Sequence, residues 1–289
     1  MLKSEKNSLE SLRHESKRLM GETEEVIPEK IKQLKKILQK DKELVPHPST
    51  FDEFYLRCIR AKKYDVDRAA NLYRKFCRLR TGGGGDFLGK LKPSNYRDIL
   101  TKNFCSTLKT RDDLGRQVII VRVEKWVPSE IHFDVTILCM FLLLDEISSV
   151  EDTQLFGAIL IADLSTLGVE HAKQISPWRI HTMVKVIQDS YPLRIKEFHV
   201  VRNPKIFGTL YALAKPFLKE KMKKRINFHG DDINTFLSSV RIDSTKLPEF
   251  LGGSLSEEEY SDKSVPKRIL KKDAYYDDLL KYGYVPKPS

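Results

Sequence analysis

The sequence predicts an α/β protein in which a small all-helical N-terminal unit precedes a domain built on a mixed, largely parallel sheet. Two observations favour this fold class. Up to residue 90 the apolar residues recur at helical spacing, whereas after residue 93 short apolar runs rich in β-branched residues alternate with helical segments. The predicted boundaries are a polar segment over 1–25, a helical domain over 26–90, an α/β domain over 91–255 and a C-terminal tail over 256–289.

Three helices are predicted in the N-terminal unit. Pro28 opens the first, and the second and third begin near Thr50 and Asp65. The third ends before four successive glycines at 82–85. Because these glycines follow a helix rather than a strand, they predict a flexible connection and not a phosphate-binding loop.

The α/β domain is predicted from strands and helices that alternate along the chain. The run at 157–162 is continuously apolar, which is typical of a central strand covered on both faces. The expected order is strand 117–123, helix 133–147, strand 157–162, helix 177–189, strand 195–201, helix 204–225, strand 226–229 and helix 232–239.

Composition excludes several classes of protein. The 289 residues are 40% hydrophobic and 31% charged, which excludes a disordered chain. The longest apolar run covers ten residues, 135–144, whereas a membrane span needs about 20. The first 20 residues are too polar for a secretory signal, so we expect a cytoplasmic protein. The net charge of +11 indicates an anionic partner, either nucleic acid or a phospholipid surface.

No pattern of catalytic or metal-binding residues is found. The four cysteines form no CxxC pair, and Cys58 and Cys139 lie in apolar stretches, as buried thiols do. The seven histidines show no metal-ligand spacing, and GxSxG and HExxH are absent. Asp163 ends an apolar strand, where a carboxylate is either catalytic or, more commonly, a turn residue. We therefore expect neither an enzyme nor a metal site.

The strongest chemical signal is the basic segment 194–225, which holds ten Lys or Arg and two Glu. Arg194 and Lys196 are two apart on a predicted strand, and Lys221 and Arg225 are four apart on a predicted helix, so each pair shares a face. An apolar face on that helix fits a membrane surface with anionic headgroups. The same pattern also fits a core-facing helix with solvated lysines. Nucleic acid is disfavoured because no reading motif accompanies the charge.

Several stretches, in order over residues 45–253, resemble the CRAL-TRIO lipid-transfer family. They are FYLRCIRAKKYD at 54–65, the strand that ends at Asp163, DSYPLR at 189–194, Asn203–Pro204, KPFL at 215–218 and LPEFLGG at 247–253. Within the family the chain is most similar to the branch of the alpha-tocopherol transfer protein and the cellular retinaldehyde-binding protein. The resemblance implies that one hydrophobic molecule lies between the sheet and a mobile lid helix at about 203–221.

The resemblance also implies the residues of two sites. A phosphoinositide headgroup would be held by Arg60, Arg194, Lys196, Lys221 and Arg225. The lipid pocket would be lined by Leu138, Cys139, Met140, Leu143, Ile161, Ile175, Met183, Val186, Tyr191, Leu193, Ile195 and Phe198, with Ile206, Phe207, Leu210 and Leu213 from the lid. Each of these apolar residues fits ordinary core equally well. Cys139 and Met140 replace the more polar lining that the resemblance leads us to expect for tocopherol.

Two functions remain open at this stage. The first is a lipid carrier for tocopherol, a retinoid, a carotenoid or a similar molecule, which exchanges its ligand at phosphoinositide-containing membranes. Such a carrier would be a monomer, associate with membranes transiently and need no cofactor besides the bound lipid. The alternative is a lipid-sensing adaptor that binds a partner protein, and a stoichiometric partner that copurifies would favour it.

Overall fold

The computed structural model describes residues 2–81 and 91–284, so the predicted glycine connection lies outside the described residues. Its sheet has five strands in chain order: β1 (Cys105–Thr107), β2 (Gln117–Arg122), β3 (Ala158–Asp163), β4 (Ile195–Val201) and β5 (Ile226–Gly230). Strand β1 is antiparallel to β2, and the other neighbours are parallel. The predicted mixed, largely parallel sheet is confirmed, and the sequence reading missed only β1 among these strands.

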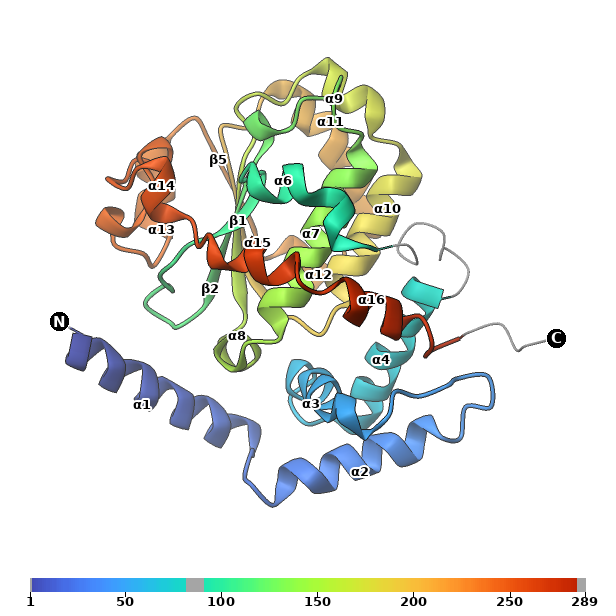
Figure 1. The fold of residues 1–289 in the computed structure, drawn as a ribbon. Coiled ribbons are helices and arrows are strands. Elements are labelled where there is room, and N and C mark those ends of the chain that lie inside the picture. Colours follow the sequence, from blue (N-terminus) through green and yellow to red (C-terminus); the bar gives the residue numbers. More distant parts are fainter. Residues whose placement is uncertain (1, 82–90, 285–289) are drawn as a thin grey trace.

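Helices cover both faces of this sheet. The parallel connections pass through α7 (Phe133–Ser148) and α8 (Glu151–Phe156), then α9 (Val169–Gln174) and α10 (Pro177–Lys185), and finally α11 (Lys205–Ala214) and α12 (Glu220–Lys223). Figure 1 shows α7, α10 and α11 on one face of the sheet, as expected when parallel crossovers between successive neighbours have the same hand. The opposite face carries α13 (Ile233–Ser239) and a smaller apolar cluster that includes Ile159, Ile161 and Leu251.

The helical unit contains the three predicted helices: α2 (Val26–Leu38), α3 (Asp52–Ala61) and α4 (Val66–Thr81). Leu34, Leu38 and Phe54 are almost fully buried between them. Most of the polar segment before this unit is helical. It forms α1 (Leu2–Met20), whose Arg13 donates to both carboxylate oxygens of Asp152 on α8 at 2.6 and 2.9 Å.

The expectation that residues 256–289 form a tail with little to pack is wrong. This segment forms α14 (Glu257–Tyr260), α15 (Ser264–Ile269) and α16 (Asp273–Leu279), and α15 and α16 lie across the molecule between α7 and the helical unit (Figure 1). Tyr276 is 2% exposed and donates to Asp145 on α7 at 2.8 Å. A bridge between Val45 and Gly283 joins the far end to the helical unit. The segment therefore fastens the two units together.

The single helix predicted over 204–225 is broken in the structure. α11 ends at Ala214, a 3-10 turn covers Lys215–Phe217, and α12 is a separate short helix. Pro216 explains the break, because proline has no N–H to donate and its ring clashes with the preceding turn. Lys221 and Arg225 consequently do not share a helix, since Arg225 lies beyond the end of α12.

A further element at the edge of the helical layer is a π-helical turn, Val186–Ser190, which follows α10 directly. Near the start of the α/β domain lies the short helix α6 (Arg97–Thr101). The described cysteines are free thiols, and Cys58 and Cys139 are buried, as predicted.

Candidate lipid cavity and basic cluster

An apolar cavity of about 250 Å3 lies between the sheet and the helices on its α7 face. The floor consists of residues near the carboxyl ends of β2, β3 and β4, among them Leu160, Ala162 and Val200. The walls are α7 and α10, and α11 covers the remaining side. The carboxyl ends of parallel strands are the usual location of a ligand in such sheets.

The lining offers a ligand almost no polar contact. Among its 27 residues the side chains with oxygen or nitrogen belong to Trp126, Thr136, Gln188 and Tyr211. The Thr136 hydroxyl donates to the carbonyl of Phe133 at 2.7 Å, and the Trp126 indole N–H donates to the carbonyl of Ile131 at 2.7 Å. Thr136 and Trp126 thus already have partners within the chain, and a cavity with so few polar groups suits a mostly hydrocarbon ligand.

Six of the sequence-predicted residues line this cavity. Met140 comes from α7, Ile175 and Met183 from the α9–α10 region, and Phe198 from β4. Phe207 and Leu210 of α11 cover it, in the position expected for a lid.

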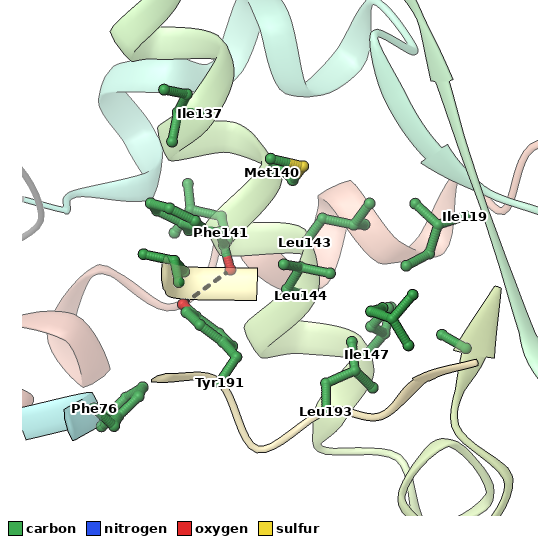
Figure 2. Packing of buried hydrophobic residues seen from close by; sticks show 14 of the residues in the cluster. Phe76, Ile119, Ile137, Met140, Phe141, Leu143, Leu144, Ile147, Tyr191 and Leu193 are labelled. Carbon is green, nitrogen blue, oxygen red and sulfur yellow. Dashed lines mark hydrogen bonds between the residues drawn. The ribbon is translucent and has the colours of Figure 1, made fainter. Parts of the chain in front are cut away.

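The other predicted pocket residues outside the lid do not line the cavity. Ile161 is one residue from Ala162 on β3, so it points to the opposite face and packs in the smaller cluster. The others are buried in the main core rather than at the cavity wall: Leu138, Cys139, Leu143, Val186, Tyr191, Leu193 and Ile195. Figure 2 shows part of this core, where Tyr191 stacks on Phe141 with ring centroids 5.8 Å apart.

Two predicted lid residues also do not line the cavity. Ile206 packs against the main core, and Leu213 is 39% exposed on the outside of α11. Three unpredicted residues of α7, Phe133, Thr136 and Ile137, line the cavity beside the predicted Met140. Their spacing of three and four residues is the signal that could have found them, but α7 is apolar nearly all round and so presents no unique face.

Four of the five predicted headgroup residues come together where β4 and β5 begin. Arg194 donates to the carbonyls of Gln154 and Leu155 at 2.8 and 2.5 Å, and Arg225 donates to the carbonyl of Ile195 at 2.5 Å. We call Arg194, Lys196, Lys221 and Arg225 the basic cluster.

A glycine makes this approach of α8 to β4 possible. Gly157 adopts a φ of 85°, and a Cβ built there would lie 2.4 Å from the carbonyl oxygen of Arg194 and 3.1 Å from Cγ of Lys196. Only glycine tolerates both the left-handed conformation and this contact.

Arg60 is not part of the basic cluster, contrary to the prediction that it holds the headgroup with the other four residues. It is 5% exposed, and its guanidinium donates to both oxygens of Glu22 at 2.9 and 2.6 Å. It also donates to the side-chain oxygen of Gln154 at 2.7 Å and to Glu151 at 3.0 Å. With these partners inside the protein, Arg60 is a buried structural cation that joins α3 to α8 and to the segment after α1.

Burial and the neighbouring positive charges lower pKa values within the basic cluster. Burial, followed by the guanidinium groups of Arg194 and Arg225, lowers the pKa of Lys196 to about 8. The pKa of Lys221 is lowered by Arg225 first and then by burial, and that of Arg194 by burial and then by Arg225. Within the described residues no carboxylate forms an ion pair with any of the four cluster residues. Such a site is suited to a multiply charged anion.

Asp163 is a structural residue. Its carboxylate pairs with the guanidinium of Arg202, with Nε at 3.0 Å, and accepts from the backbone N–H of Ser165 at 3.1 Å. Arg202 in turn donates to the carbonyl of Phe250 at 2.6 Å. Over residues 2–81 and 91–284 there is no group of three or more His, Cys, Asp or Glu arranged to hold a metal ion. No helix in those ranges is both long and apolar enough to span a bilayer.

Comparison with known proteins decides the family. A profile of the CRAL/TRIO domain matches residues 101–253, just over half of the chain, which include the sheet and the helices around the cavity. The chain belongs to the CRAL/TRIO family. The resemblance noted in the sequence is thereby confirmed.

Curated relatives agree with this assignment. The chain is similar to the alpha-tocopherol transfer protein-like protein of Homo sapiens, with 34% identity over 71% of this chain and 59% of that protein. It is also similar to clavesin-1 of Rattus norvegicus, with 30% identity over 71% of this chain and 58% of that protein. The aligned part thus covers less than two thirds of these CRAL/TRIO relatives. The fold also matches the crystal structure of Sfh5 at a TM-score of 0.50, with 13% identity over 93% of this chain and 98% of that chain.

Proposed function

We propose that this CRAL/TRIO protein is a lipid carrier that holds one small hydrophobic molecule in the cavity beneath α11. The observation that carries the proposal is the cavity itself, whose wall is apolar and whose cover is one short amphipathic helix. Removing an apolar ligand from water contributes about 25 cal/mol per Å2 of buried surface, which is sufficient to retain such a molecule. A carrier of this kind works as a monomer without a further cofactor and catalyses no reaction.

The ligand class follows from the wall of the cavity. A tocopherol, a retinoid, a carotenoid or a molecule of similar character fits, because each is mainly hydrocarbon with few polar atoms. The volume of about 250 Å3 lies just below the roughly 300–1,000 Å3 of typical small-molecule sites. A larger member of this class therefore requires α11 to move outward when it binds.

Membrane exchange is supported by the surface around the cover. Trp178 at the start of α10 is 56% exposed, and Leu213 and Phe217 near the end of α11 are 39% and 37% exposed. Apolar side chains of this kind enter the headgroup region of a bilayer, while nearby cations attract anionic lipids. We propose that the basic cluster binds a phosphoinositide headgroup while α11 opens against the membrane, so that association is transient and occurs from the cytoplasm.

A transfer assay tests this function. The full chain, loaded with a fluorescent retinoid or tocopherol analogue, is mixed with acceptor vesicles with and without phosphatidylinositol bisphosphate. We expect release into both, and faster release with the phosphoinositide. The proposal is rejected if no lipid of the class binds, and a protein that binds lipid but only as a complex with a stoichiometric partner would indicate an adaptor.

Gln188 is expected to control the rate of opening. Its side chain donates to the carbonyl of Phe217 at 2.7 Å and accepts from the N–H of Lys219 at 3.2 Å, so it fastens the segment after α11 to the π-helical turn. Each bond contributes about 0.5–1.5 kcal/mol, so Gln188→Ala should speed ligand release roughly tenfold. Gln39→Ala, at an exposed position after α2, is the matched control and should leave the rate unchanged. Equal rates for both variants would refute this role of Gln188.

Phosphoinositide binding should weaken at alkaline pH. Lys196 has a pKa of about 8 in the free protein, and bound phosphates favour its charged form and raise that pKa. Binding therefore takes up a proton above pH 8, and vesicle affinity should fall about tenfold between pH 7 and pH 9. Vesicle co-sedimentation across this range measures the effect. Lys196→Arg, which stays charged, should give a flat profile, and an equally steep profile would exclude Lys196 as the titrating group.

A further inference from the structure

A groove of about 620 Å3 lies along α2 and shares no residue with the lipid cavity. Figure 1 shows α2 at the outer edge of the helical unit, where it packs on α3 and α4. The lining residues occur in pairs at 27–28, 31–32 and 35–36, with Gln39 at the end and Asp52 of α3 at one side. Because they recur every four positions, the residues from α2 lie on one side of that helix. We call this feature the α2 groove.

The inner wall of the α2 groove is apolar and recessed. Ile27 and Ile31 are half-buried and pack against the main core, and Pro28 is exposed beside them. Lysine stems along the groove add methylene groups to this wall. None of the leucine, isoleucine and valine side chains of α2 is exposed. A bilayer takes up apolar side chains that project from a helix, so this wall suits an inserted side chain of another protein rather than a membrane.

The rim of the α2 groove is basic. Segment 30–40 holds five lysines and no acidic residue. Lys35 has partners within the chain, because its Nζ lies 2.5 Å from Oδ1 of Asp52 and donates to Oγ of Ser49 at 3.2 Å. Lys32 and Lys36 are exposed, and among the described residues no carboxylate pairs with either of them. These two lysines lie one helical turn apart and remain available to an acidic partner.

The shape and charge of the α2 groove specify the chemistry of its occupant. From position 27 to position 39 the groove is about 18 Å long, the length of about three turns of helix. A helix laid along it can place apolar side chains over Ile27 and Ile31. Carboxylates four positions apart on that helix then face Lys32 and Lys36. Such charge complementarity favours an acidic helix and repels a basic one.

We propose that the α2 groove is a docking site for an acidic amphipathic helix of a partner protein. The site lies apart from the lipid cavity and from the basic cluster, so docking leaves both of them free. It thus goes beyond the proposed carrier function, because it directs the loaded carrier to a protein target.

A pair of designed peptides tests the docking site on the full chain. The first is a fluorescein-labelled helical peptide of about four turns, with leucines at helical spacing on one face and glutamates four positions apart beside them. The second has lysine in place of each glutamate. In fluorescence anisotropy titrations we expect the glutamate peptide to bind at least about tenfold more tightly than the lysine peptide.

Lys32→Glu/Lys36→Glu should reverse this preference. Affinity for the glutamate peptide should fall about tenfold or more, and the lysine peptide should become the tighter ligand, because each attractive pair is replaced by a repulsive one. Both positions are exposed, and glutamate and lysine have similar helix propensities, so α2 is retained. Lys267→Glu/Lys271→Glu reverses two exposed cations four positions apart near the C-terminus and should change neither affinity.

The remaining outcomes overturn the proposal or separate it from the carrier function. Equal binding of both peptides by the wild type, or equal affinity of the glutamate peptide for the wild type and the Lys32/Lys36 variant, refutes the site. If the variant instead loses only binding to phosphatidylserine vesicles, the face binds a membrane. If it dissociates a dimer seen by analytical ultracentrifugation, the occupant is a second copy. Both results overturn the proposal. Retinoid-analogue binding should be the same in the variant and the wild type, so a failure of the carrier function would be detected separately.

Discussion

Ala162→Phe should strongly weaken ligand binding while the protein remains folded. Ala162 is 5% exposed on β3, and its side chain forms part of the cavity floor beneath α11. A phenyl group there occupies the space that we assign to the ligand. Overlap of this kind costs about 1–3 kcal/mol, so we expect affinity for a hydrophobic ligand to fall by up to about 100-fold. Fluorescence titration with a retinoid or tocopherol analogue measures the loss.

The neighbouring residue supplies the control. Ile161 lies on the opposite face of the same strand, in the smaller apolar cluster. Ile161→Val removes one buried methylene, which should lower the free energy of unfolding by about 1 kcal/mol and leave ligand affinity unchanged. Wild-type affinity in Ala162→Phe at native stability would show that the ligand binds elsewhere.

Glu22→Gln should cause the largest loss of stability among single polar substitutions in the helical unit. The side chains of Glu22 and Arg60 are 1% and 5% exposed, and two hydrogen bonds at 2.6 and 2.9 Å join them. Without the carboxylate, the buried guanidinium retains the half-exposed Glu151 as its one charged partner among the described residues. Removing one partner of a buried ion pair lowers the free energy of unfolding by about 3 kcal/mol. Urea unfolding would detect this loss as a lower midpoint concentration.

An exposed pair in the same region is the comparison. Glu15 and Arg18 on α1 form an ion pair at 2.7 Å with side chains that are 49% and 64% exposed. Glu15→Gln should change the free energy of unfolding by less than about 1 kcal/mol because solvent screens such pairs. Equal effects of Glu15→Gln and Glu22→Gln would contradict the structural role of Arg60.

The order of strands and helices could be predicted because it depends on local patterns. The strand at 195–201 is observed as predicted, and Pro177 opens a helix as expected. The C-terminal segment could not be recognised, because its buried residues, such as Tyr276, are few and find their partners on distant elements. Pro216 marks the break in the sequence, but the apolar periodicity on both sides of it predicts one continuous helix.

The site could be predicted only in part for similar reasons. Met140 and Phe207, which the family resemblance predicts, line the cavity, whereas Ile161, predicted in the same way, lies on the other face of β3. A strand that is apolar on both sides shows no alternation from which the face of Ile161 could be derived. The direction of the Arg60 side chain depends on Glu22, which is 38 residues away. The sequence around Glu22 is polar and does not indicate that the segment packs against the helical unit. Long-range pairs of this kind leave no mark in local sequence.

Native mass spectrometry tests the central claim most directly, that the cavity under α11 holds one hydrophobic molecule. The full chain and Ala162→Phe are each incubated with a mixture of tocopherol, retinoid and carotenoid, and any bound molecule is then extracted and identified. We predict a complex of one protein with one ligand for the wild type and the unliganded mass for the variant. A wild-type protein that takes up none of these molecules, or a variant that retains the same ligand, would contradict the account.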